Sequence, residues 1–214
     1  MSKYIWYDII IAYYNKAIKM RRKEFNFNDI KKIENMLNTI EYGVMALPDK
    51  IPYAVPISFC YKDNEIYFHG APSGRKYELL KNNPKVSFTA SKPYSYIPST
   101  FNNNTMIPTQ FFFSVYIEGE VNLIDNIEKR KNILYELVKK YEKDNNNLSI
   151  ENKMFEYAQK SMMIGIIKIE TITAKAKFGQ NMSDEEINIL IKDLEKRGEK
   201  IDLETIEMMK NVRK

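Results

Sequence analysis

The segment from residue 42 to residue 70 constrains the fold of this chain most, because strand-like runs follow one another there across short turns. YGVMAL (42–47) precedes a turn around PDK, YAVPISFCY (53–61) precedes a turn at KDN, and EIYFHG (65–70) then returns. β-Branched and aromatic residues favour strands, and turns between such runs favour antiparallel hairpins. The segment therefore predicts neighbouring antiparallel strands that begin a sheet.

Further strands and helices are predicted along the rest of the chain. Residues 92–110, rich in Pro, Asn, Ser and Thr, predict a long loop that is either a lid or mobile. Strands dominate the middle of the chain, so the predicted fold is mainly β with flanking helices, as a closed or half-closed antiparallel barrel. Residue patterns place the other strands at 85–91, 111–124 and 163–177, and the helices at 28–41, 74–83, 126–142, 151–161 and from Ser183 onward.

Charge and the scarce residue types exclude several classes of function. The net charge is +5, and KMRRK at 19–23 is the only basic cluster, so no nucleic-acid-binding face is predicted. One cysteine, Cys60, and one histidine, His69, exclude an internal disulfide and a metal site built from Cys or His. We therefore expect a buried structural thiol, no metal, and a reducing cytoplasmic location.

The N-terminal segment is apolar, but Asp8 interrupts it. It is shorter than the roughly 20 apolar residues that span a bilayer, and no small-residue cleavage site follows it. We therefore expect no membrane segment and no signal peptide. Residues 1–19 are expected to be either a helical extension that packs on the domain or on a partner subunit, or a leader before a start at Met20.

Gly74, Arg75 and Lys76 begin a predicted helix directly after a strand and a small-residue turn. Free backbone N–H groups at a helix start attract anions, and two cationic side chains add charge-assisted hydrogen bonds. A small phosphate ester is the expected ligand, and a solvated first turn is the alternative. His69 lies near the end of the preceding strand, where it contacts a ligand, acts as a proton donor near neutral pH, or is a structural residue. The paired strand contains Pro56, which favours an edge or a bulge whose free backbone could lie along a flat ligand.

Several segments together resemble a known family of flavoproteins. They are MRRKEFNFND (20–29), IEYGVMAL (40–47), the stretch from PYAVPISF to PKVSF (52–88) and FSVYIEGEV (113–121). These segments are similar to the nitroimidazole-resistance (Nim) family, within the pyridoxamine 5'-phosphate oxidase-like flavoproteins. KFGQNMSDEE (177–186) is similar to a tail motif of related FMN-binding proteins. The resemblance covers roughly residues 20–180.

The resemblance implies a split β-barrel homodimer that holds FMN at the subunit interface. It implies an FMN-binding domain at 20–180, flanked by the extension at 1–19 and a helical tail at 181–214. His69 is the implied catalytic residue, and Arg75 and Lys76 are the implied phosphate ligands. With Gly74 from the helix-start argument, the expected cofactor-binding residues are Ala54, Val55, Pro56, Ile57, Ser58, Phe59, His69, Gly70, Gly74, Arg75, Lys76 and Ser114.

The implied activity is FMN-dependent reduction of small electron-poor substrates, with nitroimidazoles as the example and a reduced nicotinamide as a possible donor. The sequence departs from the oxidase at Phe59, where the oxidase usually has lysine. It also has no match for the C-terminal Trp and Arg residues that bind the oxidase's substrate. Pyridoxine phosphate is therefore not the expected substrate. The alternatives are a non-enzymatic flavin or haem binder, and an oxidase-like protein that acts on another substrate.

Overall fold

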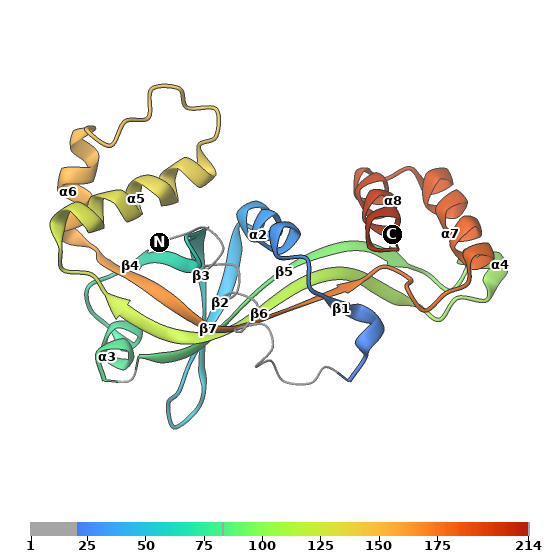
Figure 1. Ribbon diagram of the computed structural model, residues 1–214, viewed down its shortest axis with the longest axis horizontal. Coiled ribbons are helices and arrows are strands. Elements are labelled where there is room, and N and C mark those ends of the chain that lie inside the picture. Colours follow the sequence, from blue (N-terminus) through green and yellow to red (C-terminus); the bar gives the residue numbers. More distant parts are fainter. Residues whose placement is uncertain (1–20, 83, 214) are drawn as a thin grey trace, which may run out of the picture. The chain divides into compact units, whose positions relative to one another are not determined.

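The computed structural model describes residues 21–82 and 84–213 (Figure 1). Its strands are β1 (Asn26–Phe27), β2 (Tyr42–Leu47), β3 (Tyr53–Lys62), β4 (Glu65–Gly70), β5 (Lys85–Ile97), β6 (Thr109–Leu123) and β7 (Met163–Lys177). Its helices are η1 (Lys23–Phe25), α2 (Ile30–Thr39), α3 (Arg75–Asn82), α4 (Phe101–Asn104), α5 (Ile127–Tyr141), α6 (Lys153–Ser161), α7 (Asp184–Arg197) and α8 (Lys200–Val212). The predicted helix at 1–19 lies outside the described residues.

The strands form an antiparallel barrel, as the sequence predicts. Among the described residues the sheet order is β1-β7-β4-β3-β2-β5-β6, and a further pairing of β7 with β6 closes it. The register pairs β2 with β3 from Tyr42↔Ser58 to Leu47↔Tyr53, and β4 with β7 from Glu65↔Lys168 to Gly70↔Met163. The fold is therefore mainly β with flanking helices.

The chain divides into two compact units, and the boundaries between them fall between Asn28 and Asp29 and within β5, β6 and β7. The first unit contains Asp29–Ala90 and Tyr116–Ile172. The second contains Ser91–Val115, Thr173–Lys214 and the described residues up to Asn28. The division predicted at residues 20–180 and 181–214 follows the family resemblance rather than these contacts, and it stays a prediction.

The hairpins predicted between residues 42 and 70 are confirmed. The turn between β3 and β4 contains Asp63 and Asn64, whose φ angles of 52° and 62° lie in the left-handed region that short polar side chains tolerate. β3 pairs with β4 only from Phe59↔Phe68 to Lys62↔Glu65, whereas Tyr53–Ser58 pair with β2. Pro56 therefore lies where β3 has a partner on one side only among the described pairings, as predicted for an edge position.

The prediction of a loop over residues 92–110 is wrong at both ends. β5 continues to Ile97, and β6 already begins at Thr109. Tyr94, Ser95 and Ile97 are buried, and the Ser95 N–H donates to the Thr205 Oγ1 of α8 at 3.0 Å. Contacts with a distant helix thus hold a strand that its Pro- and Ser-rich composition does not indicate.

The first unit is held together by a core of large apolar side chains. Phe59 and Phe68 of the central hairpin are fully buried, and so is Phe88 of β5. The rings of Phe59 and Phe88 meet edge to face, with centroids 5.0 Å apart. A second cluster places α5 and α6 against β3, β4 and β7 through residues that include Cys60, Tyr67, Leu137 and Phe155. Leu134, Leu137 and Phe155 of this second cluster also line a pocket beside His69, which is described below.

Candidate functional site

The cofactor-binding stretch predicted at residues 54–59 lies on β3, where successive side chains face opposite sides of the sheet. Ala54 and Pro56 are exposed and Ser58 is half-buried, whereas Ile57 and Phe59 are buried. The stretch therefore does not present one uniform surface. A ligand outside the barrel meets the side chains of Ala54, Pro56 and Ser58, and only the backbone of the residues between them.

His69, Gly70 and Lys76 are brought together at the end of β4. A β-carbon at Gly70 would lie 2.6 Å from the Lys76 Nζ, so the ammonium rests against the Gly70 backbone and glycine leaves room for it. Burial lowers the pKa of Lys76. Burial and then the charge of Lys76 lower the pKa of His69, so its imidazole is neutral at pH 7.

Lys76 is a half-buried cation that has no carboxylate partner within residues 21–82 and 84–213. A buried charge is costly unless an opposite charge or hydrogen bonds compensate it. Lys76 lies in the first turn of α3, where N–H groups without helical partners also favour an anion. The local charge therefore favours an anionic ligand at this position.

Arg75, its neighbour, has a different environment. Its guanidinium donates to the Asp49 carboxylate at 2.7 and 3.0 Å and to the Ile51 carbonyl at 3.3 Å, and it lies over the Tyr53 ring. Gly74, before it, has a φ of +92°, which favours glycine. An anion that binds Arg75 must share its guanidinium with Asp49, and an exposed pair of this kind contributes little to stability.

Because His69 is the only histidine in the chain, its titration can be followed directly by NMR. We expect its midpoint below the ordinary value of 6.5, and Lys76→Ala should raise the midpoint by removing a neighbouring positive charge. Lys81→Ala, at the exposed end of the same helix, is the matched control and should leave it unchanged. The same midpoint in the wild type and in Lys76→Ala would contradict the proximity of the two groups.

Tyr141 and Lys140, at the end of α5, also reach β3, and the sequence did not indicate either residue. The Tyr141 hydroxyl accepts from the Phe59 N–H at 3.2 Å and donates to the Glu41 carbonyl. The Lys140 ammonium donates to the carbonyls of Leu37, Ile40 and Phe59, and burial lowers its pKa to about 8. These contacts link residues far apart in the chain, so no local pattern could reveal them.

The remaining predicted residues lie elsewhere. Ser114 is half-buried on β6 in the second unit and lines none of the three pockets described here. Cys60 is buried, as predicted for a structural thiol, and burial raises the pKa of its thiol. In the described part of the chain, no group of His, Cys, Asp and Glu side chains could hold a metal ion, and no helix could span a membrane.

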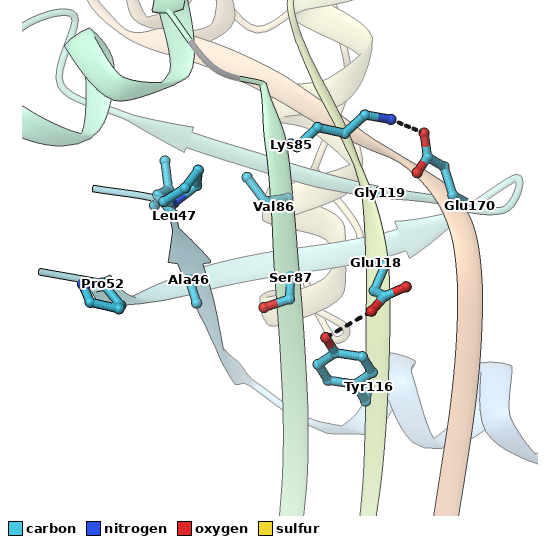
Figure 2. Close-up of a pocket in the computed structure, with 11 residues that line it drawn as sticks. Ala46, Leu47, Pro52, Lys85, Val86, Ser87, Tyr116, Glu118, Gly119 and Glu170 are labelled. Carbon is cyan, nitrogen blue, oxygen red and sulfur yellow. Dashed lines mark hydrogen bonds and ion pairs between the residues drawn. The ribbon is translucent and has the colours of Figure 1, made fainter. Parts of the chain in front are cut away.

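Three pockets are candidates for the site. Figure 2 shows one of about 470 Å³ in the first unit, where Lys85 pairs with Glu170 and the Tyr116 hydroxyl donates to Glu118 at 3.1 Å. Its charged side chains thus already have partners. Another, of about 530 Å³, lies in the second unit beside Lys175 and Lys177. The third, of about 310 Å³, is lined by Ser58 and His69, so it alone of the three includes predicted site residues.

Comparisons with known proteins agree with the barrel. The structure is similar to a candidate 5-nitroimidazole antibiotic resistance protein from Bacteroides thetaiotaomicron VPI-5482, with 22% identity, a TM-score of 0.58, and 70% of this chain and 85% of that chain covered. It is also similar to the flavocytochrome Anf3 from Azotobacter vinelandii, with 16% identity, a TM-score of 0.59, and 81% and 79% covered. A FAD and haem binding protein from Mycobacterium smegmatis matches with 16% identity, a TM-score of 0.57, and 76% and 78% covered.

At these identities the structural likeness establishes the fold alone. Comparison with curated proteins gave no match. The family model of pyridoxamine 5'-phosphate oxidase matches residues 29–176, which is more than half of the chain and includes every strand from β2 to β6. On this match, the chain belongs to the pyridoxamine 5'-phosphate oxidase family.

Proposed function

We propose that the chain is a cytoplasmic, FMN-binding flavoprotein of the nitroimidazole-resistance type, which reduces small electron-poor molecules. The observation that carries the proposal is the half-buried Lys76, which has no carboxylate partner in the described residues and lies beside Gly70 and His69 at the start of α3. A phosphate there would compensate the buried charge. The names of several structural relatives, which refer to flavin binding or nitroimidazole resistance, agree with the proposal.

Bound flavin would supply the transfer of hydride or electrons. The chain's own residues would hold and orient it: Lys76 through the phosphate, and β3 through its outward side chains and its backbone. For a nitro compound, the net two-electron step consumes a hydride from a reduced nicotinamide and a proton, and it yields a nitroso compound, oxidised nicotinamide and water. His69 lies where it could place a neutral imidazole beside the reacting molecule.

Flavin binding is tested by the visible absorption spectrum of the purified protein. We expect flavin bands, or their appearance after FMN is added and free FMN removed. Anaerobic addition of NADH or NADPH, with and without a nitroimidazole, then tests the activity. Oxidation of the nicotinamide should require both the protein and the drug. A colourless protein that does not retain added FMN would exclude the proposal. A flavin-loaded protein that does not reduce the nitroimidazole would support flavin binding but contradict the proposed activity.

The main alternative is a non-enzymatic flavin or haem binder. It is favoured by the names of two structural relatives and by the His69 imidazole, which makes no hydrogen bond to the rest of the described chain. Imidazole is a common axial ligand of haem iron. Added haem would then produce a Soret band that His69→Ala alters, whereas the main proposal predicts no such dependence on His69.

A homodimer is part of the proposal. The register of β2 and β3 sets Tyr42 and Val44 beside Ser58 and Pro56 on the same face of the sheet, and Tyr42 is 61% exposed. Exposed apolar surface of this kind often marks a protein interface. Val44→Asp should therefore weaken dimerisation at least 10-fold, about 1.4 kcal/mol, in multi-angle light scattering. Leu203→Asp, at another exposed apolar position, should have no effect, and a wild-type monomer would contradict the dimer.

A further inference from the structure

The cavity beside His69 lies between α5, α6 and the adjoining strands β3 and β4. Its volume is about 310 Å³, near the lower limit of roughly 300 Å³ for small-molecule pockets. That size suits a molecule with a single ring. Most of the lining is apolar. It comes from Met162, which follows α6, and from six residues of the two helices, namely Leu134, Leu137, Val138, Met154, Phe155 and Ala158.

The cavity walls are fixed by contacts outside the cavity. The Lys131 ammonium of α5 pairs with the Glu156 carboxylate of α6 at 2.6 Å, and the Lys131 side chain is only 8% exposed. Arg130 donates to the carbonyls of Ile124 and Gln159, which ties α5 to the end of α6. Leu137 and Phe155 belong to the core cluster that also contains strand residues. A ligand therefore meets walls that are already formed.

The polar groups of the cavity differ in their capacity to bind a ligand. Tyr141 already accepts from the Phe59 N–H and donates to the Glu41 carbonyl. The His69 imidazole makes no hydrogen bond within residues 21–82 and 84–213. A half-buried imidazole without a partner gains most from a ligand that supplies one. Of these two groups, His69 is therefore the one that is available to orient a bound molecule.

The charge of the lining selects against anions. No lysine or arginine of the described chain lines this cavity, whereas the carboxylate of Glu142 does. Glu142 is exposed, and the Asn145 amide donates to its carboxylate at 2.7 Å. An anion would lose its hydration among apolar side chains and face the Glu142 carboxylate, because the cation beside His69, Lys76, lies outside the lining.

We propose that this cavity binds an uncharged, single-ring aromatic molecule, whose ring packs between α5 and α6 and whose polar substituent hydrogen-bonds to His69. Ala158 and Leu137 set the space for the ring, and Glu142 excludes anionic analogues. The identification of the bound molecule as the electron acceptor rests on the proposed function. Binding itself requires neither flavin nor a reductant.

The test compares two probes with the same ring, uncharged 4-nitrobenzyl alcohol and anionic 4-nitrobenzoate, by calorimetry with the full chain. We expect the alcohol to bind at least 10-fold more tightly than the benzoate. Ala158→Phe, which fills the cavity, should weaken binding of the alcohol at least 10-fold, whereas Lys160→Phe, at an exposed position of the same helix, should not. Glu142→Gln should improve binding of the benzoate several-fold, and His69→Ala should weaken binding of the alcohol about 2- to 10-fold.

Equal affinity for the two probes, or no binding of the alcohol, would overturn the proposal. Full affinity in a folded Ala158→Phe would do the same, and if that variant does not fold, the comparison of the two probes in the wild type decides. The titrations are run without flavin and again after FMN is added. If the protein binds the alcohol but does not retain FMN, the proposed function is contradicted and the cavity proposal is supported. If the protein retains FMN but does not bind the alcohol, the proposed function is supported and the cavity proposal is contradicted.

Discussion

Asp202→Ala is expected to lower the free energy of unfolding by about 3–5 kcal/mol, because it removes one partner of a buried ion pair. The Asp202 side chain has no exposed area, and it accepts from Arg197, from the Ser95 hydroxyl at 2.5 Å and from the Glu199 N–H at 3.0 Å. These bonds join α8 to α7 and β5 within the second unit. The substitution leaves the Arg197 guanidinium with only the more distant Glu199 carboxylate, at 3.7 Å, and the Tyr96 carbonyl as polar partners in the described chain. Urea denaturation measures the loss.

The matched control is Asp184→Ala. Asp184 also pairs with an arginine, Arg213, at 2.6 Å, but its side chain is 93% exposed, so the expected loss is below about 1 kcal/mol. Ser95→Ala is a milder variant for use if Asp202→Ala does not fold. It should lower the free energy of unfolding by about 1–2 kcal/mol. Similar losses for Asp202→Ala and Asp184→Ala would contradict the importance of burial.

The contribution of Asp202 should also depend on pH. Burial raises the pKa of this carboxyl, but hydrogen bonds from Arg197 and Ser95 outweigh that effect and hold the pKa below its usual value of 3.8. A lowered folded-state pKa gives stability that is present above the unfolded pKa and lost as the pH falls through the folded one. The difference between the wild type and Asp202→Ala should therefore shrink at pH values below about 4.

Lys76→Met is expected to raise the dissociation constant of FMN about 10- to 100-fold, since a charge-assisted hydrogen bond contributes about 1.5–3 kcal/mol. The same substitution should raise the stability of the flavin-free protein at pH 7, because it removes a buried charge without a carboxylate partner in the described chain. Opposite effects on binding and stability separate a ligand-binding lysine from a structural one. Flavin fluorescence and urea denaturation measure the two quantities.

The controls use the other cations of α3. Arg75→Ala should weaken FMN binding less, because Asp49 and the Ile51 carbonyl already hold its guanidinium. Lys81→Met, at the far end of the helix, should change neither quantity. Unchanged FMN affinity in Lys76→Met would refute the phosphate assignment, and lower stability of the flavin-free variant would show that Lys76 has a structural role.

The sequence predicted the central strands well because each is a local pattern. Tyr42–Leu47 and Glu65–Gly70 have the predicted bounds, and the helix predicted at 28–41 is capped by Asp29, whose side chain accepts from the Lys32 N–H. The second half of β5 was missed because Ser95 is held by a helix more than 100 residues away, at Asp202 and Thr205. No residue near Ser95 carries that information.

The candidate site was predictable only in part. The segment from His69 to Lys76 is continuous in the sequence, so its strand, turn and helix could be recognised. The two cationic residues at the start of the helix could be recognised in the same way. The different environments of Arg75 and Lys76 depend on Asp49, which lies in another turn. The apolar cavity depends on the packing of α5 and α6 against β3 and β4, and its specificity residue Glu142 follows the end of a helix without any distinctive motif.

The change of partner strand along β3 leaves part of this strand at an edge of the sheet. Tyr53–Ser58 have one neighbouring strand in the described pairings, so this stretch is a strand edge to which another chain could add itself. Pro56 interrupts the row of backbone donors there, and a proline is one of the devices that natural sheets use against edge-to-edge aggregation. The same proline that is expected along a ligand thus removes a backbone donor that an added strand would need at this edge.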